Sequence, residues 1–362
     1  MIDESSETCF PARLGLYCFA HYIIDLATTY ILIGYIWYKF YDIPGYILFY
    51  GIAFAGQMPL GLLADKLNRN GLVASCGCLV MILACMMMYS GIDSFYYFIL
   101  VLGALGNALV HVGGGIDVIN HCGMRKGPLG LFVSPGYLGL FTGVLLTKCH
   151  GDFNIEISIV LALTAIAIPM LQKRSLGSLK SQNPPLSLRV SLPNSPRLWI
   201  AAAVTALFVV VCMRAYLGLS AAFEWKNDWY WFYFLVGALV AGKATGGLLS
   251  DRFGMLRTAI VSLVAASVLY AFPGAPVAGV LAVFFFNMTM PMTLWALSRI
   301  FNQARGFAFG TLTLSLFLGF WLSEAHPEPL IPMGLGFSAA ALLSLALLYI
   351  GIRPLNNALF LR

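Results

Sequence analysis

The chain has 362 residues, of which 60% are hydrophobic and only 10% are charged, and its formal net charge is +6. Soluble domains are about half apolar and about a quarter charged, so this composition excludes a soluble globular protein. Runs of about 20 apolar residues are what the hydrocarbon core of a bilayer requires. The composition therefore predicts an all-α polytopic membrane protein.

The N-terminal segment, MIDESSETCFPAR, is acidic. It lacks the basic region and the small-residue cleavage site of a removable signal peptide, so we do not expect it to be one. The eight cysteines fall mostly inside apolar runs or near helix ends, without metal-ligand spacing. We expect them to be small buried hydrophobic side chains, with no disulfide framework and no metal site.

Apolar runs and the breakers between them predict twelve transmembrane helices. In the first half of the chain they are 13–38, 45–64, 71–91, 94–115, 128–148 and 154–172. In the second half they are 198–221, 229–250, 257–273, 277–298, 306–322 and 333–352. The segment 173–197 is rich in serine, proline and basic residues. We interpret it as a cytoplasmic linker between an N-terminal six-helix bundle (1–172) and a C-terminal one (198–362).

Lysine and arginine are distributed unevenly over the predicted loops. If the N-terminus is cytoplasmic, only Lys39, Lys148 and Lys226 of the 21 basic residues fall in outer loops, and Arg214 and Lys243 fall within spans. The other basic residues lie on the cytoplasmic side, whereas the outer loops carry acidic residues. The positive-inside rule then predicts a plasma (inner) membrane protein with both termini in the cytoplasm. The net charge is an orientation signal, and no nucleic-acid partner is expected.

One short charged turn occurs twice. GLLADKLNRNG begins at Gly61, and GLLSDRFGMLR begins 186 positions later, at Gly247. Each copy follows the second predicted helix of its half, which indicates an internal duplication of six helices. At these residues the chain resembles the major facilitator superfamily, whose loop between helices 2 and 3 reads roughly G-x-L-A-D-R-x-G-R-R/K. Asn68 and Met255 depart from that pattern, where the family has a glycine and a basic residue.

The resemblance implies two six-helix bundles with a substrate site at mid-membrane between them, as in other members of the superfamily. It also implies a cytoplasmic gate, whose contacts form when the cytoplasmic side is closed and break when it opens. The matching residues are Gly61, Asp65, Lys66, Arg69, Gly247, Asp251 and Arg252. The alternative is a charged turn that only fixes the topology. We expect a monomer whose partners are a small-molecule substrate, a proton and the lipid bilayer.

Ionisable side chains within predicted spans are candidates for function, because a bilayer disfavours them. In the first span, Tyr17, His21, Asp25 and Thr28 lie on one stripe of the helix. Burial and neighbouring charges both shift the pKa of a carboxyl group, so such a group can exchange a proton near neutral pH. We predict that Asp25 couples protons, with His21 as its partner, and that Tyr17 contacts substrate. A static ion pair or a hydrogen bond between helices is the alternative.

The fourth span reads LGALGNALVHVGGGIDVINHCG. We predict that Asn107 and His111, which share a small and polar face, contact the substrate. We also expect Gly113–Gly115 to end the helix, leaving Asp117 at the cytoplasmic edge.

The fifth span contains SPGY, in which Pro135 and Gly136 predict a kink and a close helix contact. We assign the next residue, Tyr137, to the substrate site. The pairing of HVGGG with SPG also resembles, more weakly and only locally, transporters of the fosmidomycin-resistance type.

In the second half, Arg214, Lys243 and Asn287 are the polar residues predicted to contact substrate. Arginine keeps its charge in a protein, so Arg214 requires a counter-charge: Asp25, a substrate anion or water. Because the buried acid lies in one half and the buried basic residues in the other, a small anionic solute moved with protons is favoured.

These features predict a secondary active transporter that uses alternating access, is coupled to protons and carries a small anionic organic solute. Proton-driven efflux of a drug or other toxic amphiphile is the alternative direction. Neither reading needs catalytic residues or a cofactor, and the sequence has no Walker-type nucleotide motif. A membrane enzyme using His21 and Asp25 as an acid–base pair, and a passive channel, are less favoured. The first leaves the duplication unexplained, and the second would require polar pore rings.

Overall fold

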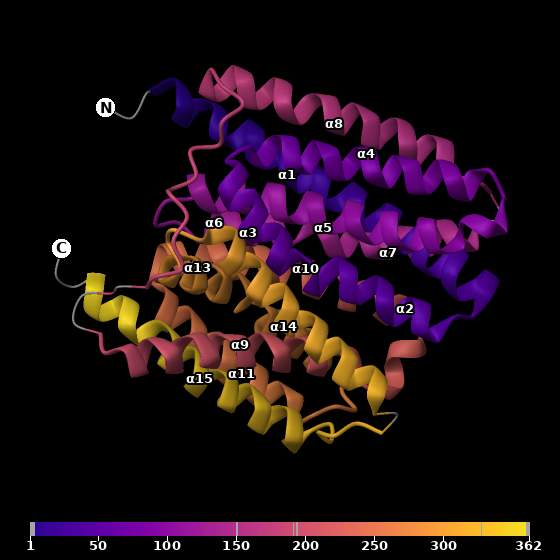
Figure 1. The fold of residues 1–362 in the computed structure, drawn as a ribbon. Coiled ribbons are helices and arrows are strands. Elements are labelled where there is room, and N and C mark those ends of the chain that lie inside the picture. Colours follow the sequence, from indigo (N-terminus) through magenta and orange to yellow (C-terminus); the bar gives the residue numbers. More distant parts are fainter. Residues whose placement is uncertain (1–3, 150, 191, 193–194, 327, 360–362) are drawn as a thin grey trace. The chain divides into compact units, whose positions relative to one another are not determined.

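The computed structural model describes residues 4–149, 151–190, 192, 195–326 and 328–359. Within these residues every regular element is a helix (Figure 1). The all-α class predicted from composition is therefore confirmed. The side chain of Cys9 lies outside the described part; the other seven cysteines are free thiols. Cys76 and Cys149 are exposed, so the expectation of burial holds only for some of them.

The first half of the chain forms α1 (Glu4–Thr29), η1 (Tyr30–Phe40), α2 (Ile43–Tyr50), η2 (Gly51–Ala55), α3 (Gln57–Leu67), α4 (Asn70–Tyr89), η3 (Asp93–Phe95), α5 (Tyr96–His121), α6 (Gly127–Val133), α7 (Pro135–Lys148) and α8 (Asn154–Leu176). The second half forms α9 (Arg197–Ser220), η4 (Glu224–Asn227), α10 (Trp229–Phe253), α11 (Met255–Tyr270), α12 (Pro276–Asn287), α13 (Met290–Ile300), α14 (Arg305–Ala325) and α15 (Leu335–Leu359). The segments η1 and η2 are π-helical continuations of their neighbours, and η3 and η4 are short 3₁₀ turns.

Eleven helical stretches among the described residues are long and apolar enough to cross a membrane, and some combine consecutive elements. Each coincides with a predicted span; the span 13–38, for example, lies within Phe10–Phe40. The twelfth predicted span, 257–273, corresponds to α11, which is apolar but has only 16 residues. At 1.5 Å per residue it extends about 24 Å, so flanking residues must complete a crossing of about 30 Å. The chain is an integral, multi-pass membrane protein.

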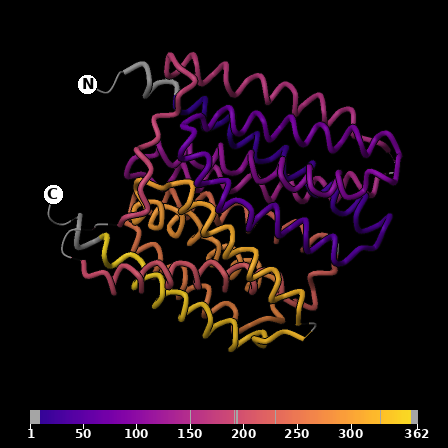
Figure 2. The backbone as a smooth tube through the Cα atoms, viewed as in Figure 1, coloured from indigo at the N-terminus to yellow at the C-terminus, as the bar shows by residue number. Residues whose placement is uncertain are grey.

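The described helices cluster into two compact units. Unit 1 comprises Met1–Gly123, Pro135–Leu186 and Arg305–Gly310. Unit 2 comprises Met124–Ser134, Ser187–Ala304 and Thr311–Arg362. Each unit thus includes one short segment from the other half of the sequence. Inside unit 1, α4 packs against both α5 and α8, and α1 packs against α7 (Figure 2). The division of the chain at the linker 173–197 stays a prediction.

The helix α5 runs unbroken to His121, so the expectation that Gly113–Gly115 ends it was wrong. A Cβ atom at Gly113 would lie 2.5 Å from the backbone nitrogen of Ala74 on α4. Glycine is a poor helix former, but here it permits a helix contact that a larger residue would block. Asp117 consequently lies within the helix and not beyond its end, and its side chain is buried, with an exposed fraction of 2%.

Candidate functional site

The main polar cluster of unit 1 is centred on Asp25 of α1. The Nε2 atom of His21, one helical turn earlier, lies 3.3 Å from Asp25 Oδ2. The Nε2 atom of His111, on α5, lies 3.5 Å from Asp25 Oδ1. All three residues are buried, and the two imidazole rings meet edge to face at 4.4 Å. A carboxylate with an imidazole at each oxygen is the centre of this cluster.

Asn107 fixes the position of the carboxylate from α5. Its Nδ2 donates to Asp25 Oδ1 at 3.0 Å and to Thr28 Oγ1 at 2.9 Å. The backbone carbonyl of Asn107 lies 2.9 Å from Nδ1 of His111, so this nitrogen carries the proton and Nε2 is left to face Asp25. A neutral imidazole in this tautomer can accept a proton at Nε2. One residue of α5 therefore orients both the carboxylate and the second imidazole.

The third wall of the cluster is formed by α7, which begins at Pro135 after α6 ends at Val133. A Cβ atom at Gly136 would overlap Nε2 of His21 and Oδ2 of Asp25. The kink and the close helix contact predicted from SPG are therefore confirmed. Tyr137 follows on α7 with a half-buried side chain.

This arrangement can exchange protons, because a carboxylate and two imidazoles share a buried space. The same three side chains each offer one ligand atom, and these atoms all lie within 4.8 Å of one another. By geometry alone they are also close enough to hold a metal ion. The sequence analysis did not predict a metal site. His111, predicted as a substrate contact, lies directly against the predicted coupling residue.

In unit 2, Arg214 of α9 is buried, with an exposed fraction of 6%. Its Nη1 lies 3.4 Å from Oγ1 of Thr289 and 3.5 Å from Oγ1 of Thr293. Both threonines flank the start of α13, and the sequence analysis did not select them. Only the combination of features could have indicated them: two hydroxyl groups four residues apart, beside a proline, within an apolar span.

Three other predicted substrate contacts lie on separate helices, and one of them, Asn287, is two residues from Thr289. Tyr17 interacts with Arg13 and Asp117 rather than with Asp25. Asn287, at the end of α12, donates its Nδ2 to the carbonyl of Val283 in its own helix at 2.8 Å. Lys243 lies half-buried on α10, in unit 2. The roles of these three residues stay predictions.

A second buried ion pair in unit 1 escaped the sequence analysis. Arg13 of α1 contacts Asp117 of α5, and each has an exposed fraction of 2%. Nη1 of Arg13 also lies 3.3 Å from His121 Nε2 and 3.5 Å from Ser175 Oγ on α8. Arg13 stands at the edge of the first span, where a basic residue predicts the cytoplasmic surface rather than a buried pair.

The two copies of the charged turn place their aspartates against helix starts. Within unit 1, both oxygens of Asp65 accept from the backbone N–H of Gly306 at 2.9 Å, and Oδ2 accepts from that of Phe307 at 3.1 Å. Within unit 2, Asp251 accepts from the backbone N–H groups of Lys126 and Gly127 at 2.7 Å. Each aspartate thus caps a helix contributed by the other half of the sequence, α14 or α6.

The glycines of the turns permit these approaches. A Cβ atom at Gly61 would overlap the backbone of Gly306, and one at Gly247 would lie 2.6 Å from the carbonyl oxygen of Lys126. The basic members of the predicted gate are exposed instead: Lys66, Arg69 and Arg252.

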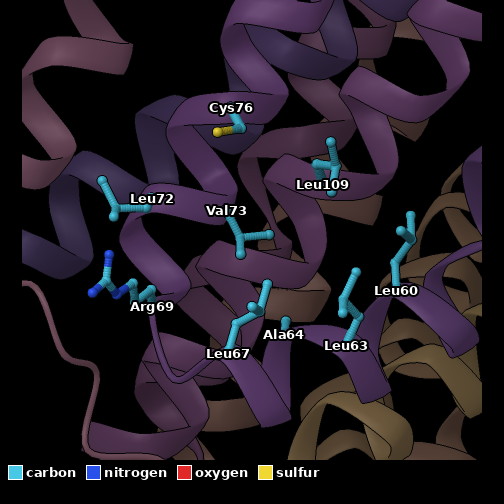
Figure 3. Close-up of a pocket in the computed structure, with 9 residues that line it drawn as sticks. All are labelled: Leu60, Leu63, Ala64, Leu67, Arg69, Leu72, Val73, Cys76 and Leu109. Atoms are coloured by element: carbon cyan, nitrogen blue, oxygen red, sulfur yellow. The ribbon is translucent and has the colours of Figure 1, made fainter.

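A groove of about 240 Å³ runs along α3 and α4 beside the first turn (Figure 3). Its lining is almost entirely hydrocarbon, and Arg69 lies at one end. It contains none of the predicted substrate residues. Because it offers few polar groups to orient a solute, it is not the candidate site.

Comparison with solved structures shows the fold. The chain is similar to an E. coli fucose:proton symporter, FucP, over 94% of its own length and 98% of that chain, with 14% identity and a TM-score of 0.60. A structure of FucP, a major facilitator superfamily transporter, in the outward conformation gives 14% identity and a TM-score of 0.64, covering 95% and 98%. A bacterial homologue of the iron transporter ferroportin, in an outward-facing state, gives 14% identity and a TM-score of 0.58, with the same coverage.

No protein-family model matches the chain, and no curated protein is similar to it in sequence. The identity to the solved structures is low, so their similarity establishes the fold alone. The chain has the major facilitator fold, as the doubled turn led us to expect.

Proposed function

We propose that the chain is a secondary active transporter that moves a small anionic organic solute together with protons by alternating access. The observation that carries this proposal is a carboxylate, Asp25, buried between two imidazoles in a chain with this fold. A buried ionisable group inside a span costs free energy, so such a group is a candidate for function. The fold supports transport, since the similar structures are described as transporters.

The proton-coupling role rests on how charge is balanced around Asp25. When ionised, the carboxylate is stabilised by the amide of Asn107 and attracts a protonated imidazole of His21 or His111. A proton bound at Asp25 removes that attraction and changes the relative stability of conformations that expose the cluster to one side or the other. The described function of the similar fucose symporter, which is coupled to protons, supports this reading.

The anionic nature of the solute rests on Arg214. This guanidinium keeps its charge at all physiological pH values and is buried against two hydroxyl groups, which are neutral. A solute anion would supply the missing counter-charge. The proposed substrate residues are those predicted from the sequence, with Arg214 as the central one.

The doubled turns are proposed as the cytoplasmic gate. Asp65 holds the start of α14 and Asp251 holds the start of α6 through backbone N–H groups. An anion at a helix N-terminus is stabilised by the helix dipole, typically by about 0.3–1 kcal/mol at an exposed residue such as Asp251 and by up to about 2 kcal/mol at a buried one such as Asp65. Such contacts are weak enough to break in each transport cycle. With both termini on the cytoplasmic side, the gate faces the cytoplasm of a plasma (inner) membrane.

The experiment is proton uptake by proteoliposomes that contain the full chain and an entrapped pH-sensitive dye. Lactate, gluconate and benzoate are added outside in turn, and the neutral sugar L-fucose serves as a comparison. We expect at least one of the anions to acidify the lumen faster with wild-type protein than in protein-free liposomes, where only the undissociated acid diffuses across the bilayer. Asp25→Asn should abolish this protein-dependent acidification while preserving counterflow of the same radiolabelled anion.

The matched control is Asp152→Asn, which removes an acid from an exposed position after α7. It should acidify the lumen as the wild type does. Gradient-driven accumulation that survives in Asp25→Asn would refute the coupling role. Acidification by fucose alone would refute the anionic solute but leave proton coupling in place.

A further inference from the structure

The second centre, at Arg214, lies where the tenth predicted span is interrupted. The helix α12 ends at Asn287, a two-residue turn follows, and α13 begins at Met290 with Pro291 in its first turn. Proline lacks a backbone N–H and cannot continue the hydrogen-bond ladder of a helix interior. The break is buried, with Thr289 at 1% and Thr293 at 0% exposed. The C-terminus of α12 and the N-terminus of α13 therefore both lie inside the protein, within a membrane span.

The two threonine hydroxyls at this break can act only as hydrogen-bond acceptors toward other groups. Thr289 donates its hydroxyl hydrogen to the carbonyl of Phe286 at 3.0 Å, and Thr293 donates to that of Met290 at 2.9 Å. Both can only accept from Arg214, and they do so at long distances through the same nitrogen, Nη1. The remaining N–H groups of the guanidinium, on Nε and Nη2, take no part in these contacts.

The charge of Arg214 has no acidic partner in its own unit. Among the described residues of unit 2, no acidic side chain forms an ion pair with Arg214. The helix dipoles do not alter this balance, because the negative C-terminus of α12 and the positive N-terminus of α13 meet at the same break. Burying a charge without a counter-charge is unfavourable. An anion would supply that counter-charge.

We propose that Arg214, held by Thr289 and Thr293, forms a carboxylate-binding subsite, and that the carried solute is a monocarboxylate. That the solute is carried rests on the proposed transport function, whereas binding at Arg214 does not. A guanidinium presents two parallel N–H donors that match the two oxygens of a carboxylate.

Charge favours a carboxylate over a phosphate. Arg214 supplies one full positive charge, which balances one negative charge. A phosphate monoester carries about 1.5 to 2 negative charges at neutral pH, so it would be left partly uncompensated. Thr289 and Thr293 add no further hydrogen to donate, because both hydrogens are already used within α12 and α13.

The test is binding to the purified full chain in detergent by isothermal titration calorimetry. The probes are lactate, gluconate and benzoate, their neutral amides, and inorganic phosphate. We expect at least one carboxylate to bind, and its amide to bind at least about 10-fold more weakly, the lower end for a hydrogen bond to a charged group. Tight phosphate binding that depends on Arg214, with no carboxylate bound, would overturn the assignment of ligand class.

Variants locate the subsite. Arg214→Gln should abolish carboxylate binding, and Arg214→Lys, which keeps the charge without the fork, should weaken it about 10-fold. The matched control is Thr258→Val on α11, a buried threonine of the same unit that also donates to its own helix. It should bind as the wild type does. Size-exclusion profiles check that each variant is folded. If Arg214→Gln is not folded, the result for Arg214→Lys decides the test.

The outcomes separate the subsite from the transport function. The subsite is refuted if no carboxylate of the panel binds. It is also refuted if a carboxylate binds to Arg214→Lys and Arg214→Gln as tightly as to the wild type. If carboxylates bind through Arg214 but proteoliposomes show no transport of them, the subsite stands and the transport proposal fails.

Discussion

His111 on α5 reaches Asp25 on α1, with its Nε2 atom 3.5 Å from the carboxylate Oδ1. The same oxygen also accepts from the amide of Asn107 at 3.0 Å. An imidazole from a second helix therefore approaches the carboxylate independently of His21, which lies on the same helix as the acid. The proposed proton exchange at the cluster would therefore depend on the packing of α1 against α5.

The first prediction is that His111→Gln uncouples proton flow from solute flow. Glutamine keeps a hydrogen-bonding group near Asp25 but cannot bind a proton at neutral pH, because an amide has no such pKa. We expect solute-driven acidification of proteoliposomes to fall at least about 10-fold, the lower end for loss of a general acid or base. Counterflow should continue. Both are measured on the same preparation over pH 5.5–8.

The control is His326→Gln, since His326 is exposed after α14. It should show the wild-type pH profile. A chelator on both sides of the membrane is a second control: unchanged transport is expected if the cluster binds protons, and loss of transport would show that it works with a metal ion. An unaltered profile in His111→Gln would leave the imidazole as a packing element only.

The second prediction concerns the glycine that closes the cluster. Gly136→Ala would place a methyl group against His21 and Asp25. We expect the thermal midpoint of unfolding to fall and transport to be lost, because overpacking costs typically about 1–3 kcal/mol. Fluorescence-detected thermal unfolding in detergent measures the change. The matched control is Gly237→Ala on α10, where a Cβ atom meets nothing within 4 Å. Equal midpoints for the two variants would contradict the close packing.

The sequence predicts most of the fold, because apolar runs and their breakers report directly on membrane thickness. The duplicated turn at Gly61 and Gly247 added the expectation that the two halves are related, which hydropathy alone does not give. The expectation failed at Gly113–Gly115, where local propensity predicts a helix end. Close packing against α4 outweighs that propensity, and packing between helices cannot be read from one helix at a time.

The candidate site was predictable only in part. Asp25, His21 and His111 stand out since ionisable residues are rare within spans, and the structure brings the three together. Tyr17 lies on the same stripe of α1 as His21 and Asp25, but it contacts Arg13 and Asp117 instead. The stripe is long enough to meet two sets of partners. Thr289 and Arg13 have ordinary positions in the sequence. Their importance depends on partners from distant helices, which a single sequence does not specify.

The third prediction tests the doubled turn. Asp65→Asn leaves one acceptor oxygen where two now meet the N–H groups of Gly306 and Phe307. We expect the start of α14 to become more accessible, so that a cysteine introduced at the buried Ala304 reacts faster with a water-soluble maleimide, in a background that lacks the exposed Cys76 and Cys149. The reference is Asp93→Asn, which removes an exposed acid paired with Lys39. It should not change the labelling rate. Identical rates in both variants would mean that the turn fixes topology only.

The fourth prediction concerns the buried pair of Arg13 and Asp117. Asp117→Asn leaves the guanidinium of Arg13 without its counter-charge, and breaking a buried pair costs about 3–5 kcal/mol. We therefore expect a markedly lower thermal midpoint for Asp117→Asn. The double variant Arg13→Met with Asp117→Leu removes both charges and should recover most of the loss, as apolar replacements of buried pairs often do. Thermal unfolding of the purified variants provides the comparison. If the double variant is no more stable than Asp117→Asn, the unpaired charge does not dominate: the hydrogen bonds of Arg13 to His121 and Ser175, which only the double variant loses, then stabilise the protein as much as the charge pair does.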